Sequence, residues 1–297
     1  MSVIVTGASG QLGRLVAQEL LDRLSPDELI LVTRRPHSLA DLEERGVEVR
    51  RGDFDEPESL VDAFAGGDRM LMISTMAIGQ RTQQHRAALE AAAAAGVRHV
   101  AYTSLTNPVS GHPTGILADE NRETEEMLEQ SDLAWTALRN AAYAELQIPL
   151  GAIAVTYGKL VTNAGAGRVA PISRSDCAAA AAVVLTTDGH EGRAYEITGP
   201  EALTQPDIAA LLSEVSGRPV EVIPSSDRRL MWGLIRLGTP KPVARSIVQL
   251  GVATREGYFD VVDPAFEELV GRRPRTLRDV LIEHRGQLAA EAGVAYG

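Results

Sequence analysis

The chain has 297 residues, 44% of them hydrophobic, and a formal charge of −11. This length suits one large α/β domain, or such a domain with an added lobe, and the negative charge disfavours a nucleic-acid partner. The single cysteine, Cys177, excludes an intramolecular disulfide and a cysteine-based metal site. It lies in an alanine-rich helical run, and we interpret it as a small buried residue and not as a nucleophile.

The first apolar run spans only residues 2–6, which is too short for a signal peptide. No run approaches the roughly 18 uninterrupted apolar residues of a membrane-spanning helix. We therefore expect a cytoplasmic protein with no nucleic-acid and no membrane partner. The sequence leaves open whether the protein forms a homo-oligomer.

The chain opens with a strand, a glycine turn and a helix. Ser2 to Thr6 is a β-branched apolar run, the turn has the spacing G-x-x-G-x-x-G, and Arg14 to Leu24 has helical periodicity. In such a unit the glycines allow a sharp turn, a close approach of a pyrophosphate and a tightly packed helix, and the helix N-terminus attracts phosphates. The residues expected at a dinucleotide here are Gly7, Ser9, Gly10, Gln11, Leu12 and Gly13.

The second strand, Leu29 to Thr33, ends where a doubly wound sheet meets the adenosine ribose. An acidic residue there would indicate NAD, but this strand is followed by Arg34 and Arg35. A guanidinium group can hold a 2′-phosphate through two hydrogen bonds. We therefore predict NADPH (NADP) in preference to NADH, with Arg34 ahead of Arg35 as the contact. The alternative is that both arginines are merely solvated.

The third strand, Val47 to Arg51, runs into Gly52-Asp53-Phe54-Asp55. At this strand end Asp53 could bind the adenine amino group and Phe54 could cover the adenine ring. Alternatively, Phe54 belongs to the core and Asp53 forms the turn.

The fourth and fifth strands are Arg69 to Ser74 and Val97 to Thr103. The fourth is almost continuously apolar, as strands buried on both faces of a parallel sheet are. The polar residues at the ends of these strands should lie at the carboxyl edge, where ligands bind: Ser74, Thr75, Thr103 and Ser104. The helices after the third, fourth and fifth strands are expected at Glu58 to Phe64, Thr82 to Ala95 and Ala118 to Gln130.

Strands alternating with helices predict an α/β fold, a Rossmann-type doubly wound parallel sheet with a smaller C-terminal substrate lobe. Ala134 to Arg139 is the sixth strand, followed by Asn140 and Tyr143. We assign residues 1–150 to an NAD(P)-binding Rossmann domain and residues 151–297 to a region that shapes the substrate site.

The C-terminal region contains weaker signals. The segment from Gly151 to Pro171 is glycine-rich, and we expect it to be irregular. Asp176 is expected to cap a helix that runs through Leu185. A strand near residues 194–198 should rejoin the sheet. Thr204 and Asp207 form a capping pattern for a helix over 206–216, a further strand is expected over 218–223, and residues 227–297 contain helical pieces.

Several motifs together resemble the NmrA-like atypical short-chain dehydrogenase/reductase family, and within it the subgroup of bacterial type 2 NAD(P)H:quinone oxidoreductases and triphenylmethane reductase. They are TGASGQLG, GDFD, ISTMAIGQR, AYTSL, LADENRETEEML and LRNAAY. The resemblance covers nearly the whole chain. It implies hydride transfer from a nicotinamide cofactor to an activated acceptor, and it places Asn140 beside the cofactor.

Most short-chain dehydrogenases use a Tyr-x-x-x-Lys pair as proton donor and ribose ligand, but this chain has Leu117 and Asn121 at those positions. Neither residue can do that acid–base work. Members of the resembling subgroup also lack the pair but carry histidine where Asn121 stands. The active-site residues we expect are therefore Tyr143, Asn121 and Ser104. Tyr143 is placed to cover the nicotinamide or to touch the substrate; the alternative is a core or lid aromatic.

Histidines provide no metal site, since the six are scattered without the spacing of metal ligands. His85 is interpreted as a surface or packing residue, and His112 lies in a loop that could line the pocket. We predict an NAD(P)H-dependent reductase of quinones or similar conjugated electrophiles, whose partner is a small-molecule hydride acceptor. The alternative is a non-enzymatic NAD(P)-sensing regulatory protein, as other NmrA-like proteins are.

Overall fold

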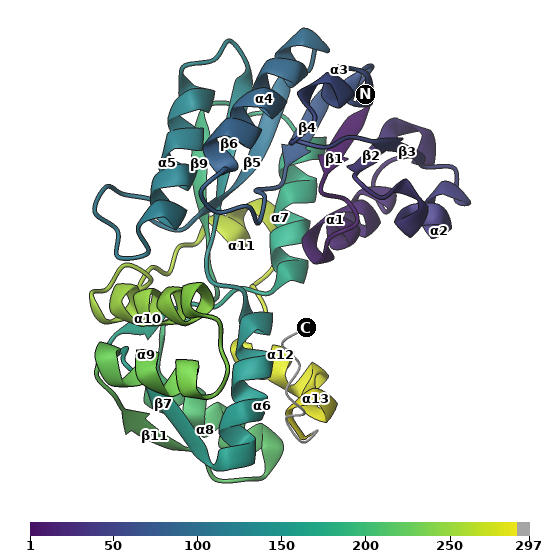
Figure 1. The fold of residues 1–297 in the computed structure, drawn as a ribbon. Coiled ribbons are helices and arrows are strands. Elements are labelled where there is room, and N and C mark those ends of the chain that lie inside the picture. The colour runs from purple at the N-terminus through teal and green to yellow at the C-terminus, as the bar shows by residue number, and fades with distance from the viewer. Residues whose placement is uncertain (290–297) are drawn as a thin grey trace.

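A computed structural model describes residues 1–289. Its centre is a seven-stranded, entirely parallel sheet in the order β3-β2-β1-β4-β5-β6-β9 (Figure 1). The strands are β1 Val3–Thr6, β2 Leu29–Thr33, β3 Glu48–Arg51, β4 Arg69–Met72, β5 His99–Leu105, β6 Ala134–Asn140 and β9 Arg193–Ile197. The direction of winding reverses between β1 and β4, and ligands bind at such a switch point, beyond the carboxyl ends of the strands.

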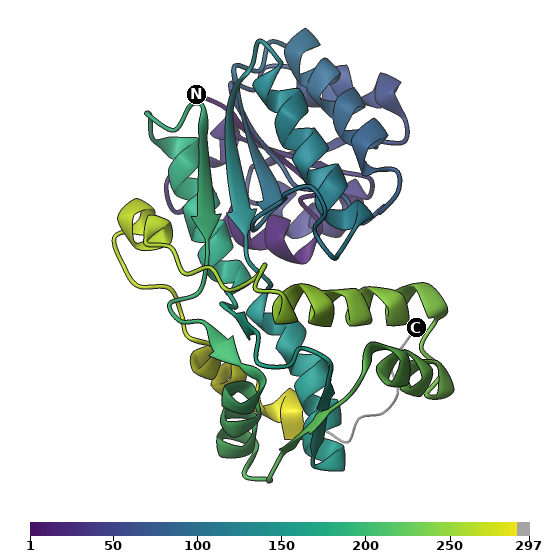
Figure 2. The ribbon, with the colours of Figure 1, turned by 90° about the vertical axis from the view of Figure 1, so that its left-hand side faces the viewer.

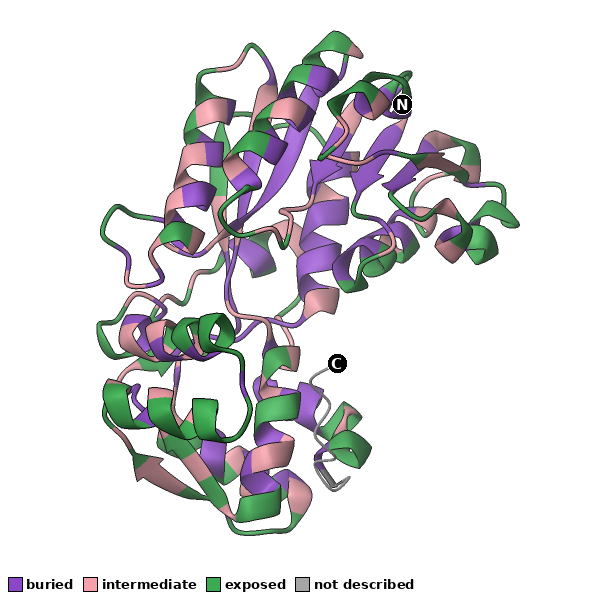
Figure 3. Cartoon of the chain, viewed as in Figure 1, coloured by how far each residue is buried: buried purple, intermediate pink, exposed green. Residues whose placement is uncertain are grey.

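Helices cover both faces of the sheet. The bounds on one face are α1 Gln11–Leu21, α7 Arg174–Thr186 and α11 Ala265–Val270, and on the other α3 Leu60–Phe64, α4 Arg81–Ala94 and α5 Ile116–Glu129. A short helix, α2 Ala40–Glu43, and three 3-10 turns complete the connections: Pro26–Glu28, Pro36–Leu39 and Pro57–Ser59. The apolar faces of sheet and helices meet in two buried layers, which Figure 3 shows along the strands.

The C-terminal lobe lies beyond the carboxyl edge of the sheet (Figures 1 and 2). It is built from a 3-10 turn at Ala144–Leu146, α6 Gln147–Tyr157, β7 Lys159–Thr162, β8 Arg168–Val169, β10 Leu203–Thr204, α8 Gln205–Ser216, β11 Glu221–Pro224, α9 Asp227–Arg236, α10 Lys241–Arg255, α12 Leu277–Glu283 and α13 Arg285–Ala289. It has a core of its own, which includes Leu212, Phe259 and Leu281. After β6 the chain enters the lobe through α6, β7 and β8, and it then returns to the sheet for α7 and β9. The sheet domain and the lobe are therefore each built from more than one segment of the sequence.

The predicted doubly wound parallel sheet is confirmed, and β9 rejoins it as expected. The predicted irregularity of Gly151 to Pro171 is wrong. The segment begins inside α6 and continues into β7 and β8. Gly151 is a close-packing residue of that helix, since a Cβ there would lie 2.6 Å from Leu212 Cδ2. The helix ends at Gly158, which adopts a left-handed conformation.

Two capping expectations had different outcomes. Thr204 and Asp207 form the predicted capping box of α8. Asp176 does not cap α7; the cap is Ser173, whose hydroxyl accepts a hydrogen bond from the Asp176 amide over 3.0 Å. The Asp176 carboxylate is fully buried and instead binds Arg272 from near the C-terminus. The strand expected over 218–223 is present as β11, which begins three residues later and spans Glu221–Pro224.

Candidate cofactor and active site

The glycine turn after β1 has the geometry of a phosphate cradle. Gly7 has φ +61°, and a Cβ on Gly13 would lie 2.5 Å from the Gly7 carbonyl oxygen, so both positions need glycine. Gly10 is the N-cap of α1 and supplies no side chain, so no capping group engages the first amides of the helix. Open amides at a helix N-terminus fit a pyrophosphate.

Small hydroxyl groups connect this turn to the end of β2. Ser9 Oγ lies 2.7 Å from Thr33 Oγ1, which also accepts a hydrogen bond from the Arg35 amide. Arg34 and Arg35 are exposed, and within residues 1–289 neither side chain makes a hydrogen bond or ion pair. Arg14 also reaches this edge, where it pairs with Asp41 at 3.0 Å. Arg14 lies in the first turns of α1. Its ion pair with Asp41 could not be foreseen from the sequence, because the two residues are 27 positions apart.

At the end of β3 the geometry supports the turn-forming interpretation of Asp53. Its Oδ1 accepts a hydrogen bond from the Asp55 amide over 3.1 Å. Phe54 is half-buried, and its ring meets the His85 ring edge-on with the centroids 6.5 Å apart. One face of Phe54 thus joins the core, and its partial exposure is compatible with contact to an adenine.

A network of hydrogen bonds holds the segment after β4. The Ser74 amide donates to Thr103 Oγ1 over 2.9 Å, and the Thr75 amide donates to His85 Nε2 over 3.2 Å. The fully buried His85 is therefore a packing residue. Burial, together with the charge of Arg81, lowers the pKa of His85 to about 3, so the ring is neutral. Its Nδ1 then carries the proton and faces Thr124 Oγ1 at 2.9 Å.

Two buried polar atoms without partners stand at the ends of β5 and β6. Ser104 Oγ and Asn140 Oδ1 make no hydrogen bond within the part of the chain that the structure describes. The strand register brings these neighbouring strand ends together. A buried polar atom is seldom left unpaired in a native protein. These atoms fit the amide and hydroxyl groups of the nicotinamide half of a dinucleotide.

Asn121 uses its amide inside the protein. Its oxygen accepts a hydrogen bond from the Tyr102 hydroxyl over 2.8 Å, and its nitrogen donates to the Leu117 carbonyl over 2.7 Å. The side chain is only 2% exposed. Asn121 thus positions Tyr102 and the first turn of α5, and this geometry does not favour direct contact with a substrate. Burial raises the pKa of Tyr102, which keeps the hydroxyl neutral.

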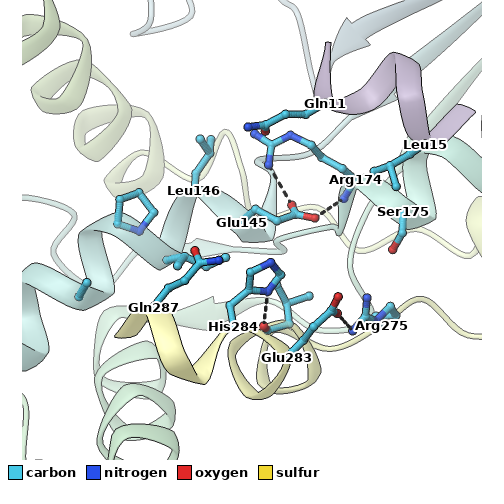
Figure 4. A pocket seen from close by; sticks show the side chains of 14 residues that line it. Gln11, Leu15, Glu145, Leu146, Arg174, Ser175, Arg275, Glu283, His284 and Gln287 are labelled. Carbon is cyan, nitrogen blue, oxygen red and sulfur yellow. Dashed lines mark hydrogen bonds and ion pairs between the residues drawn. The ribbon is translucent and has the colours of Figure 1, made fainter. Parts of the chain in front are cut away.

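Tyr143 follows β6 and lies under a guanidinium group, with Arg174 Cζ 4.6 Å from the ring centre. Arg174 pairs in turn with Glu145 at 3.4 Å. Burial raises the pKa of Tyr143, so its hydroxyl is a poor proton donor near neutral pH. These groups adjoin a cavity of about 690 Å³ that extends from Gln11 on α1 to the lobe helices α6, α12 and α13 (Figure 4).

Two further residues differ from what the sequence indicated. His112, in a loop that could line the pocket, is 3% exposed and packs its ring against Tyr258, with the ring centres 4.5 Å apart, so it anchors the loop to the lobe. Arg81 was not singled out at all, although it belongs to the motif ISTMAIGQR. It begins α4 and is only 5% exposed, and no side-chain partner for its guanidinium occurs within residues 1–289.

Cys177 is buried as expected, and burial raises the pKa of its thiol well above the usual range. No group of three or more potential metal-ligating side chains occurs among the described residues. In the same part of the chain, no helix is long and apolar enough to cross a membrane.

Comparisons with known proteins agree with this geometry. A family model described as NAD(P)H-binding matches residues 7–188. Quinone oxidoreductase 2 of Escherichia coli is 36% identical over 278 residues, which cover 93% of this chain and 96% of that protein. Its crystal structure with NADPH superposes with a TM-score of 0.91 and covers 95% of this chain and 99% of that one.

Triphenylmethane reductase of Citrobacter sp., solved with NADP(H), is 34% identical, with a TM-score of 0.87 and coverage of 96% of this chain and 100% of that one. The glycine cradle, the unpaired polar atoms at the sheet edge and these similarities lead to one assignment. The chain belongs to the NAD(P)H-binding family and is an NAD(P)H-dependent oxidoreductase.

Proposed function

We propose that this oxidoreductase uses NADPH to reduce quinones or similar conjugated electrophiles in the cytoplasm. The bound cofactor would supply a hydride. The observation that carries the proposal is the combination of a nucleotide cradle with an active-site edge that lacks a titratable acid–base pair. Quinones are activated acceptors whose reduced oxygen takes its proton from water, so the protein needs mainly to position the reactants and exclude solvent.

The preference for NADPH rests on the end of β2. Arg34 is exposed and unpaired within residues 1–289, and its sequence neighbours Thr33 and Arg35 are not acidic, so neither can accept from a ribose 2′-hydroxyl as a carboxylate would. A guanidinium is well suited to a 2′-phosphate. Arg14 adds a second positive charge near this strand end, although Asp41 partly neutralises it.

The nicotinamide half would lie over the ends of β4, β5 and β6. Ser104 Oγ and Asn140 Oδ1 would orient it, because both are buried and lack another partner in the described chain. Tyr143 would cover the ring and touch the acceptor, held in place by Arg174. We assign Tyr143 a packing role, because burial disfavours ionisation of its hydroxyl.

The apolar character of the acceptor is supported by large hydrophobic side chains that are exposed in the segment after β4 and in the C-terminal lobe. Met76 is 86% exposed and Trp232 is 61% exposed. Met76 lies in the segment after β4, and Trp232 belongs to α9 in the lobe. Exposed apolar side chains on loops and lobe elements are typical of a site for a flat apolar molecule.

The decisive test is NADPH oxidation with a panel of quinones, cationic dyes, enones, imines and simple ketones, with NADPH binding measured in parallel. We expect turnover with quinones and little or none with simple ketones. Tight NADPH binding without turnover of any acceptor would instead support a regulatory NAD(P) sensor.

A further inference from the structure

We propose that Arg81 is a catalytic residue of this enzyme, whose guanidinium stabilises the negative charge that develops on the acceptor during hydride transfer. This inference rests on the proposed function and extends it to the residue that replaces the missing Tyr-x-x-x-Lys pair.

The first observation is that Arg81 is buried and that its side chain has no bonded partner in the described chain. The residue is 5% exposed, its Nε has no hydrogen-bond partner, and no ion pair to its guanidinium occurs in the described chain. The nearby carboxylate of Glu120 is engaged elsewhere, since it accepts hydrogen bonds from the backbone amides of Gly79 and Arg81. A buried cation without a bonded partner is costly, so a charged or polar ligand is the natural complement.

The second observation is the position of Arg81 along the sheet edge. Arg81 follows β4, and the ionisable groups that act on it are Glu120, Tyr102 of β5 and Tyr143 after β6. His85, one turn further along α4, is neutral. Of these groups, Tyr143 lies at the carboxyl edge after β6, where the proposed function places the nicotinamide, and Tyr102 and Glu120 are buried beneath it. In the sheet order β1 and β2 lie on one side of β4, with the pyrophosphate cradle and Arg34 at their ends, whereas β5 and β6 lie on the other side, with Tyr102 and Tyr143.

Other candidates for this role are already engaged. Asn121 holds Tyr102 and the Leu117 carbonyl. Arg139 pairs with Glu125 at 2.6 Å, and Arg174 pairs with Glu145 at 3.4 Å. Among the described residues at this end of β5 and β6, Arg81 is therefore the guanidinium left to meet a new negative charge.

The chemistry separates two kinds of acceptor. A neutral quinone takes the hydride with its two electrons, the dihydronicotinamide is oxidised, and the quinone becomes a hydroquinone monoanion that then takes one proton from water. A cationic dye takes the same hydride and becomes neutral, with no anion formed. A fixed guanidinium lowers the barrier only where negative charge develops. It should help quinones and give no help to cationic dyes.

The kinetic test compares Arg81→Met with Arg81→Lys and with the control Arg86→Met, which removes an exposed arginine from the same helix. For Arg81→Met we expect kcat/KM with a quinone to fall by about 10²–10³-fold, with a partial recovery in Arg81→Lys. The rate with a cationic dye should stay level or rise. The Kd for NADPH should stay within about threefold, and Arg86→Met should resemble the unaltered enzyme. Equal losses with quinone and dye would overturn the proposal.

A binding test does not depend on turnover. 4-Nitrophenol is titrated with pH in the complex with NADP⁺, and its phenolate is followed by absorbance. With Arg81 present the bound phenol should ionise at a pH about one unit lower than in Arg81→Met. Identical ionisation in both proteins would overturn the role of Arg81. If the unaltered enzyme reduces no acceptor but this difference is present, the proposed function fails while the anion-stabilising role of Arg81 remains supported.

Discussion

The Tyr102 hydroxyl donates a hydrogen bond to the Asn121 side-chain oxygen over 2.8 Å, and both residues are almost fully buried. This bond joins β5 to α5 and engages the residue that the sequence analysis aligned with the lysine of a Tyr-x-x-x-Lys pair. The Asn121 side chain thus supports the protein scaffold, and we expect it not to contact the ligand. We therefore expect hydride transfer at this edge to draw its electrostatic support from another element.

The Tyr102–Asn121 bond should contribute measurably to stability. Asn121→Ala leaves a buried hydroxyl without its acceptor, so we expect a loss of about 1–3 kcal/mol in the free energy of unfolding. Tyr102→Phe should relieve part of that loss in the double variant. A double-mutant cycle by urea denaturation should give a coupling of about 0.5–3 kcal/mol. Strictly additive effects would mean that the bond does not stabilise the fold.

Arg34 should determine the cofactor preference. Arg34→Ala removes a charge-assisted contact worth about 1.5–3 kcal/mol, which corresponds to an increase of about 10- to 100-fold in the Kd for NADPH. The Kd for NADH should change little, because NADH lacks the 2′-phosphate. Arg35→Ala is the matched control, and isothermal titration provides the measurement. Equal affinity of the unaltered protein for NADPH and NADH would refute this assignment.

Two glycines of the same turn should respond differently to substitution. Gly10 has an extended backbone, φ −77° and ψ 170°, which a side chain tolerates, and a Cβ there would meet the Gly7 carbonyl oxygen at 3.1 Å, a tight contact that a small shift relieves. Gly10→Val should therefore keep the fold and lose NADPH binding, because its side chain occupies the space of the pyrophosphate. Gly13→Ala should instead lower the Tm, since its Cβ would meet the Gly7 carbonyl oxygen at 2.5 Å. Circular dichroism and NADPH fluorescence distinguish the two outcomes. Undiminished binding in Gly10→Val would exclude the cradle.

Tyr143→Phe should keep most of the activity with quinones. The aromatic ring beneath Arg174 is retained, and burial already makes the hydroxyl a poor acid. We expect kcat with a quinone to fall by less than about tenfold, which is below the 10²–10⁴-fold typical for loss of a general acid. Loss of nearly all turnover with intact NADPH binding would make Tyr143 the missing proton donor.

The sheet and its carboxyl edge were predictable because they depend on local patterns. Short apolar runs give the strands, and the glycine spacing gives the turn after β1. The C-terminal lobe was harder, because glycines also occur where helices pack closely: Gly151 belongs to a helix that touches Leu212. The sequence places the candidate site at the strand ends, but it did not single out Arg81. An arginine at the start of a helix is usually solvated, and only the tertiary structure buries it without a partner.

Buried neutral histidines should make the fold acid-sensitive. Burial is the main cause that lowers the pKa of His85 to about 3 and that of His99 to about 4. In the folded protein His85 Nε2 accepts a hydrogen bond from the Thr75 amide, and His99 Nδ1 is buried without a partner in the described chain. Neither ring can gain a proton without disrupting its surroundings, whereas in the unfolded chain both titrate near the ordinary value of about 6.5.

The unfolded state therefore binds more protons than the folded state between about pH 6.5 and pH 4, so the free energy of unfolding falls as the pH is lowered through this window. At pH 5 the two histidines together should take up about two protons on unfolding and weaken the fold by roughly 2 kcal/mol each relative to pH 8.

Urea denaturation at half-unit steps from pH 8 to pH 5 measures how the free energy of unfolding changes with pH. His85→Gln should reduce this dependence by about one proton, whereas His37→Gln, at an exposed position, should leave it unchanged. A free energy of unfolding that stays level from pH 8 to pH 5 would show that the buried rings accept protons in the folded state.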